Sequence, residues 1–316
     1  MRSVFCRFAK PLKITLSVSL LSVLFACKKD AKPAEPTPES EVITSTILPT
    51  PTPTVEPLVE FPIVPYTIEE RPIELENKYI YGKAYIPDDG METHPTVILC
   101  HGIGNTLSNT ENFSMMLAER GIAAYAFDFC GGGEESESSG TFLEMSVKTE
   151  AEDLNDVINF VQNQDFVNKL YLFLLGQSQG GYVVTEVAHK RQEELAGIIL
   201  MYPAFNINDL VSEMYPDPSQ IPETGEIFNL TVSRKYFEDA LAEDIKEDMN
   251  LYEKDTLIIH GSSDELVPIK YSREAVDLFW HAKLVTLWGA PHGFFGYDGK
   301  KALSACLEFI LAHSYV

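Results

Sequence analysis

The sequence Gly176-Gln177-Ser178-Gln179-Gly180 contains a serine that could act as a nucleophile. It follows the apolar run Leu170–Leu175, which predicts a strand buried on both faces, and it precedes the helix-compatible segment Tyr182–Lys190. A serine between two glycines on a sharp strand-to-helix turn has its hydroxyl raised above the edge of the sheet. A Gly-Ser-Gly cluster can also be an ordinary polar turn. The assignment of Ser178 as nucleophile therefore depends on partners elsewhere in the chain.

A serine hydroxyl needs a base to take its proton, and that base needs a carboxylate to orient it. The predicted strand Thr256–His260 leads into a loop that contains Asp264 and Glu265. We predict Asp264 as the acid because active sites of parallel sheets form just past the strand ends. Glu265 is the competing acid, and either carboxylate could instead cap the helix that follows. We predict His292 as the base because its Gly- and Pro-rich loop follows the last predicted strand.

Acyl transfer also needs hydrogen-bond donors for the oxyanion of its transition state. The predicted strand Thr96–Cys100 ends in His101-Gly102-Ile103-Gly104-Asn105, whose glycines let the backbone turn outward. We predict the backbone N–H of Ile103 as one donor and that of Gln179 as the other. A glycine loop of this kind could instead bind phosphate, but no nucleotide-binding pattern follows it. We therefore expect a site with no cofactor and no metal.

Short apolar runs alternate with amphipathic segments along the chain, which predicts βα units in a doubly wound, mostly parallel sheet. About fifty residues between Tyr202 and Thr256 interrupt this alternation, more than an ordinary loop needs. We predict a small cap there, at about 204–254, inserted after the sixth strand; a solvated acidic insertion is the alternative. The predicted strands, after two near the N-terminus, are Thr96–Cys100, Ile122–Phe127, Leu170–Leu175, Ala196–Tyr202, Thr256–His260 and Lys283–Leu287.

These elements, in the order serine, acid and histidine, form the pattern of an α/β-hydrolase. A second set of residues resembles the serine hydrolases related to bacterial feruloyl (cinnamoyl) esterases. The resemblance runs from about Tyr79 to the C-terminus and includes the insertion. The residues that carry it are Asp128-Phe129, Gly131-Gly132-Gly133, Ser136, Ser138, Gly140-Thr141-Phe142, Met145-Ser146-Val147 and Glu150.

This resemblance implies a fold, an activity and two further site residues. The implied activity is cleavage of feruloyl or cinnamoyl esters, including those on plant polysaccharide. The implied cap helps to hold the phenolic acyl group, and Tyr236 looks like the tyrosine that contacts the phenol hydroxyl. Asp209 is the implied second polar contact.

The N-terminal residues predict export and lipid anchoring. Four basic residues precede the apolar stretch Ile14–Ala26, which is too short for a comfortable membrane span and is typical of a signal peptide. The end of that stretch, Leu24-Phe25-Ala26-Cys27, resembles the lipobox of bacterial lipoproteins and implies lipid on Cys27. An ordinary secretory signal with an incidental cysteine is the alternative.

Residues 27–65 are rich in Pro, Thr, Glu and Ser and predict a disordered tether. The predicted organisation is thus a signal peptide (1–26), a tether (27–65) and a hydrolase domain (66–316) on the extracytoplasmic side of a bacterial membrane. The formal net charge of −23 argues against nucleic acid and against electrostatic binding to anionic lipid. Any membrane contact is therefore expected through the N-terminal lipid alone.

The leading interpretation is a serine hydrolase that cleaves carboxylic esters through an acyl-enzyme. Within the same fold, a generic short-chain carboxylesterase and an acyl-peptidase-like enzyme remain open. A noncatalytic surface protein that binds ligands in the cap cleft is the alternative of a different class. It would be marked by a missing triad residue, and none is missing. The acyl group, the alcohol and the oligomeric state are not predicted.

Overall fold

The computed structural model describes residues 62–314. The predicted signal peptide, Cys27 and nearly all of the predicted tether lie outside these residues. Within them, none of the helices has both the length and the apolar character that crossing a membrane requires.

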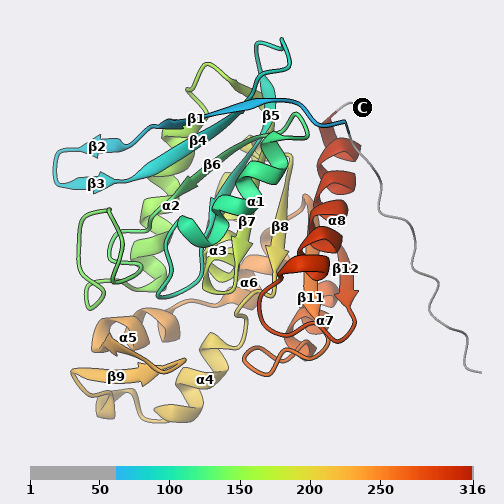
Figure 1. The fold of residues 1–316 in the computed structure, drawn as a ribbon. Helices are drawn as coiled ribbons and strands as arrows, with labels where there is room; N and C mark the ends of the chain where they lie inside the picture. The colour runs from blue at the N-terminus through green and yellow to red at the C-terminus, as the bar shows by residue number, and fades with distance from the viewer. Residues whose placement is uncertain (1–61, 315–316) are drawn as a thin grey trace, which may run out of the picture. The chain divides into compact units, whose positions relative to one another are not determined.

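Eight strands form one sheet in the order β1-β4-β6-β5-β7-β8-β11-β12 (Figure 1). The pairs β1–β4 and β4–β6 are antiparallel, and every pair from β6 to β12 is parallel. The bounds are β1 Tyr66–Glu70, β4 Gly82–Pro87, β5 His94–Cys100, β6 Ala123–Phe127, β7 Val167–Gln177, β8 Gly197–Met201, β11 Asp255–Gly261 and β12 His281–Leu287. A separate small ribbon pairs β2 (Ile73–Leu75) with β3 (Lys78–Ile80).

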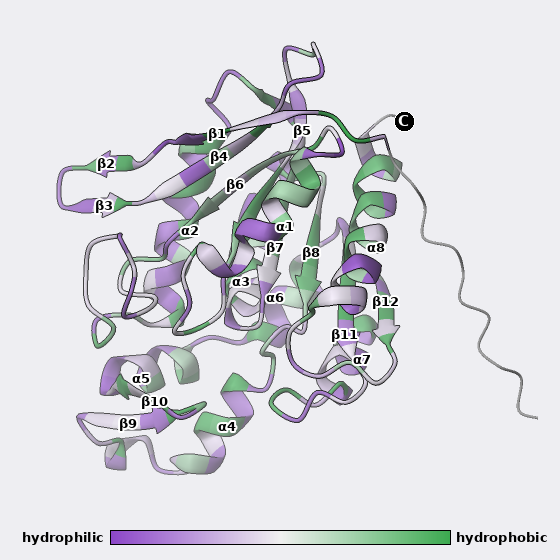
Figure 2. Ribbon diagram, viewed as in Figure 1, coloured by the Kyte–Doolittle hydropathy of each residue, from purple (hydrophilic) through white to green (hydrophobic). Residues whose placement is uncertain are grey.

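Helices cover both faces of the sheet, as the sequence predicts. Along β5, Val97 and Leu99 pack in one apolar cluster, while Ile98 and Cys100 pack in the other, because successive side chains of a strand point to opposite faces. One cluster includes α1 (Ser108–Ala118) and α8 (Gly296–Ser314). The other includes α2 (Val147–Val161), α3 (Gln179–Arg191), α6 (Ile245–Leu251) and α7 (Lys270–Leu278). The central strand β8 is apolar along much of its length, as Figure 2 shows.

The strand before Ser178 differs from the prediction at its start. Leu172 to Leu175 are buried, but Leu170 is 76% exposed. The strand β7 begins earlier than predicted, and its partner β8 starts only at Gly197, opposite Phe173. The first residues of β7 therefore project past β8, and the prediction of burial on both faces was wrong for Leu170.

The chain between β8 and β11 forms the predicted insertion after the sixth strand of the large sheet. Its elements are α4 (Ile207–Met214), the hairpin of β9 (Thr224–Ile227) and β10 (Leu230–Ser233), α5 (Arg234–Ala242) and α6. In Figure 1, α4, β9 and α5 lie beyond the arrowheads of β7 and β8. The hairpin was not predicted. The acidic stretch after the hairpin forms the two helices α5 and α6, of which α6 packs against α3 and α7.

Candidate active site

Ser178 occupies a strained turn between β7 and α3. Its φ of 53° and ψ of −120° lie in a region that side-chain-bearing residues rarely adopt. A Cβ on Gly176 would lie 2.3 Å from the Gly180 carbonyl oxygen, and a Cβ on Gly180 would lie 2.5 Å from the Cys100 carbonyl oxygen. Glycine at both positions is therefore what allows the turn to be this tight.

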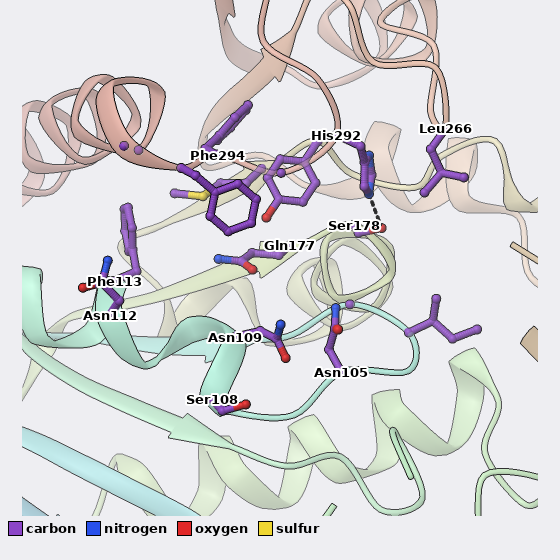
Figure 3. A pocket seen from close by; sticks show the side chains of 18 of the residues that line it. Asn105, Ser108, Asn109, Asn112, Phe113, Gln177, Ser178, Leu266, His292 and Phe294 are labelled. Atoms are coloured by element: carbon purple, nitrogen blue, oxygen red, sulfur yellow. Dashed lines mark hydrogen bonds between the residues drawn. The ribbon is translucent and has the colours of Figure 1, made fainter. Parts of the chain in front are cut away.

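Three side chains from separate loops meet at this turn. His292 Nε2 lies 3.0 Å from Ser178 Oγ (Figure 3), and His292 Nδ1 lies 2.7 Å from Asp264 Oδ2. Asp264 follows β11 and His292 follows β12, two neighbouring strands whose carboxyl ends share one edge of the sheet. The network fits the imidazole tautomer that donates from Nδ1 to the carboxylate and accepts the serine proton at Nε2. Glu265 is exposed, and the carboxylate that His292 Nδ1 contacts through a hydrogen bond is that of Asp264.

The Asp264 carboxylate is buried but well supplied with donors. Oδ1 accepts hydrogen bonds from the backbone N–H groups of Leu266 (3.0 Å) and Val267 (2.8 Å). His260 Nε2 lies 3.2 Å from Oδ2. Burial by itself would raise the pKa of Asp264, but the hydrogen bonds from His260, His292 and Val267 outweigh it and hold that pKa below its ordinary value. The carboxylate is therefore ionised at neutral pH.

The predicted oxyanion donors lie on two sides of Ser178. Gln179 is the first residue of α3, so its backbone N–H has no partner within the helix. Ile103 lines the same cavity as Ser178. The loop that carries Ile103 lies close to the nucleophile. A Cβ built on Gly102, the residue before Ile103, would be only 3.1 Å from Ser178 Cβ.

A buried histidine fixes the shape of that loop. His101 Nδ1 donates to the Gly102 carbonyl oxygen at 2.9 Å, and Nε2 accepts from the Phe129 N–H at 3.0 Å. Burial lowers the pKa of His101 and favours the neutral ring that these two bonds require. His101 therefore supports the oxyanion loop rather than the proton transfer.

Ser178 opens onto a cavity of 810 Å³ that both apolar and polar side chains line (Figure 3). Tyr202, at φ 40°, lines it and places its ring edge-on to His292, with 4.7 Å between ring centroids. The sequence did not reveal this residue, since an aromatic at a strand end usually belongs to the core. Among residues 62–314, no group of three or more His, Cys, Asp or Glu could hold a metal ion. The apolar lining includes Phe113, Met116, Phe228, Leu230, Leu266 and Phe294, and the polar lining Asn105, Asn109, Asn112, Gln177 and Tyr202.

Two predicted substrate contacts do not reach this cavity. Tyr236 is fully buried, and its hydroxyl donates to Gln179 Oε1 at 2.6 Å. Asp209 Oδ2 accepts a hydrogen bond from the Tyr271 hydroxyl at 3.0 Å, which ties α4 to α7. Neither residue lines the cavity. Other protein groups hydrogen-bond to both side chains in this arrangement of the cap, and contact of either residue with substrate stays a prediction.

Comparison with known proteins gives several similar sequences. Residues 91–238 match the family model described as serine aminopeptidase, S33. An uncharacterized 31.7 kDa protein from the traX-finO intergenic region of Escherichia coli is 31% identical over 126 residues, which cover 39% of this chain and 42% of that protein. The chain thus spans less than half the length of that relative. Rat monoglyceride lipase is 24% identical over 211 residues, with 63% of each protein covered.

Solved structures are similar over nearly their whole length. Est1E from Butyrivibrio proteoclasticus, in a structure with ferulic acid bound, has a TM-score of 0.71 and 24% identity, covering 77% of this chain and 98% of Est1E. The monoacylglycerol lipase of Paleococcus ferrophilus has a TM-score of 0.56 and 19% identity, covering 74% of this chain and 99% of the lipase. The chain therefore has the α/β-hydrolase fold, with Ser178, His292 and Asp264 arranged as in a serine hydrolase triad.

Proposed function

We propose that this protein hydrolyses carboxylic esters through an acyl-enzyme formed on Ser178. The observation that carries the proposal is the hydrogen-bonded series from Ser178 Oγ to His292 and on to Asp264, at 3.0 Å and 2.7 Å. Both distances lie within the reach that proton transfer and orientation of the base require. The series opens onto a cavity large enough for a small organic substrate.

In the first half of the reaction, Ser178 Oγ attacks the ester carbonyl carbon while His292 Nε2 takes the serine proton. Asp264 stabilises the resulting imidazolium through the hydrogen bond to Nδ1. The N–H groups of Ile103 and Gln179 bind the oxyanion of the tetrahedral intermediate. The intermediate collapses when the carbon–oxygen bond to the alcohol breaks and His292 returns the proton to that oxygen, which leaves the acyl group on Ser178.

In the second half, water takes the place of the alcohol. His292 removes a proton from water as the water oxygen attacks the acyl carbon. The bond to Ser178 Oγ then breaks, the serine regains its proton from His292, and the carboxylic acid leaves. Every proton in this sequence passes through one imidazole, so His292 and Ser178 act as a unit.

For the acyl group, we propose an aromatic one of the hydroxycinnamoyl class. Phe113, Phe228 and Phe294 line the cavity and favour a flat apolar group. The similar fold of Est1E, solved with ferulic acid bound, supports the same class. Since Tyr236 and Asp209 do not line the cavity, the proposal gives them no part in recognising the phenol hydroxyl.

A panel of esters tests both the proposed ester hydrolysis and the proposed aromatic acyl group. Turnover of p-nitrophenyl acetate by the wild-type protein, and none by Ser178→Ala, would support ester hydrolysis. A higher kcat/KM for methyl ferulate than for methyl esters of aliphatic acids of similar size would support the aromatic acyl group. Equal kcat/KM values for both would favour a generic carboxylesterase. Binding of esters without turnover would instead favour a noncatalytic surface protein.

We further propose that the enzyme is held at the outer side of a bacterial membrane by lipid on Cys27. The lipobox-like sequence before Cys27 and the Pro- and Thr-rich segment after it support this proposal. A tether of that composition would let the hydrolase domain act at a distance from the membrane surface.

A further inference from the structure

Tyr236 joins the cap to the turn that carries the nucleophile. It lies on α5 and is fully buried, with its ring 5.9 Å from that of Phe237 and nearly perpendicular to it. Its hydroxyl donates to Gln179 Oε1 at 2.6 Å. Gln179 is the residue directly after Ser178. A side chain of the cap thus holds the neighbour of the nucleophile.

The other end of the Gln179 side chain is held from the opposite side. Its Nε2 donates to Glu150 Oε2 at 2.8 Å, and Glu150 is a fully buried residue of α2. Burial, partly opposed by this hydrogen bond, raises the pKa of Glu150 to about 8, so the carboxyl is mostly neutral at pH 7. The amide of Gln179 therefore bridges α5 and α2 through two buried hydrogen bonds, and its Nε2 also makes a longer one of 3.6 Å to Met145 Sδ.

The residue held in this way has two properties that bear on catalysis. Its backbone N–H is the one predicted to bind the oxyanion, and it adjoins Ser178, whose φ of 53° is strained. A strained backbone persists only where its surroundings hold it firmly. An oxyanion donor is effective only when it is fixed in place before the charge develops. Two hydrogen bonds to the Gln179 side chain meet both needs.

We propose that Tyr236 and Glu150 are positioning residues, which hold Gln179 so that its backbone N–H points at the oxyanion. The inference rests on the proposed ester hydrolysis and adds to it a direct link between the cap and the oxyanion hole. It differs from a role in substrate recognition, because a positioning residue acts on every ester alike. Substitution of a positioning residue therefore lowers kcat and leaves KM and acyl preference almost unchanged.

Tyr236→Phe removes the hydroxyl and keeps the ring. The helix α5 keeps other hydrogen bonds, since Ser146 Oγ still donates to Asp239 at 2.5 Å and Asn208 Nδ2, on α4, to the Ala240 carbonyl oxygen at 2.7 Å. We expect kcat to fall about tenfold, less than the loss seen when an oxyanion donor is removed outright. The same factor should apply to p-nitrophenyl acetate and to methyl ferulate.

Tyr252→Phe is the matched control. Tyr252 is also fully buried, at the end of α6, but its hydroxyl has no hydrogen-bond partner among the described residues. Its loss should leave kcat at the wild-type value. If Tyr236→Phe and Tyr252→Phe have equal kcat, or if Tyr236→Phe impairs only the ferulate ester, the positioning role is wrong.

A double-mutant cycle tests whether Tyr236 acts through Gln179. Gln179→Met removes both side-chain hydrogen bonds, so adding Tyr236→Phe to it should cause little further loss of kcat. Losses that multiply would overturn the proposal.

The rate of phosphonylation by a serine-reactive phosphonate gives a second readout, and we expect it to fall with kcat in Tyr236→Phe. Ser178→Ala distinguishes failure of the positioning role from failure of the proposed ester hydrolysis. If Ser178→Ala keeps full esterase activity, the proposed function itself is wrong, whatever the result for Tyr236→Phe.

Discussion

At the scale of single residues, the site is defined by three hydrogen-bonded side chains: Ser178 and His292 exchange the proton, and Asp264 orients the base. Ser178→Ala should lower kcat by at least about 10⁴-fold, because no other hydroxyl can accept the acyl group from the same position. The hydroxyl contributes little to packing, so thermal unfolding should not change. Hydrolysis of p-nitrophenyl acetate, with unfolding measured by circular dichroism, checks both parts. Near-wild-type activity would rule out Ser178 as the nucleophile.

The two adjacent acids give a second residue-scale test. Asp264→Asn should lower kcat by about 10⁴-fold, because an amide that donates to His292 Nδ1 would favour the wrong tautomer. Glu265→Gln should leave kcat close to the wild-type value, since Glu265 is exposed and the carboxylate that His292 Nδ1 contacts is that of Asp264. The two variants are measured side by side on the same ester. A greater loss in Glu265→Gln would mean that the acid has been assigned to the wrong residue.

The sequence predicted these three residues because each follows its own strand, and the carboxyl ends of parallel strands meet at one edge. Tyr236 could not be placed in the same way. A tyrosine on an amphipathic cap helix looks the same in sequence whether its hydroxyl faces a cavity or a buried glutamine. What decides its role is the depth at which α5 packs on α2 and α3, and that is a tertiary property.

At the scale of elements, the cap contributes to the cavity through the turn of its hairpin. Phe228 and Asn229 both have positive φ, 52° and 63°, as a two-residue hairpin turn requires. Glycine is common at such positions, and its absence here is one reason that the sequence did not predict β9 and β10. Asparagine tolerates this conformation, but phenylalanine does so only at a cost. Phe228 nevertheless lines the catalytic cavity.

We therefore expect Phe228 to serve substrate binding rather than the turn. Phe228→Gly should raise KM for methyl ferulate by about tenfold, since an aromatic contact is lost, and should change KM for p-nitrophenyl acetate much less. Asn229→Gly is the matched control, because it alters the same turn but does not line the catalytic cavity. Equal effects of the two variants would mean that the turn, and not the ring, supports activity.

At the scale of the whole molecule, the acidic charge and the N-terminal residues bear on where the enzyme acts. Cys27→Ala should shift the protein from the membrane fraction to soluble or signal-retained forms, because stable anchoring takes more than one acyl chain, which a lipidated N-terminal cysteine supplies. Fractionation followed by immunoblotting measures the shift. Unchanged membrane association in the variant, with the signal peptide shown to be cleaved, would argue against lipid on Cys27.

The described domain as a whole also carries buried acids that should make its stability depend on pH. Burial raises the pKa of Glu150 and of Glu186 from 4.5 to about 8. Between pH 4.5 and about pH 8, these two carboxyls keep their protons in the folded state and lose them in the unfolded state. Stability is then greatest near and below the unfolded pKa and falls as pH rises through the folded pKa. Asp264 acts in the opposite sense below its unfolded pKa of 3.8, and His101 and His189, whose pKa values burial lowers, do so below their unfolded pKa of 6.5.

The unfolding temperature should thus decrease from about pH 6.5 to about pH 8, where the two histidines no longer oppose the two glutamates. Glu186→Gln should flatten that decrease, because a glutamine has no proton to lose, and it lies on α3 away from the cavity lining. Glu193→Gln, at an exposed position just beyond the same helix, is the control and should leave the slope unchanged. Thermal melts at constant ionic strength measure the slope. A wild-type unfolding temperature that rises between pH 6.5 and 8 would mean that these carboxyls are ionised in the folded protein, with polar partners that offset their burial.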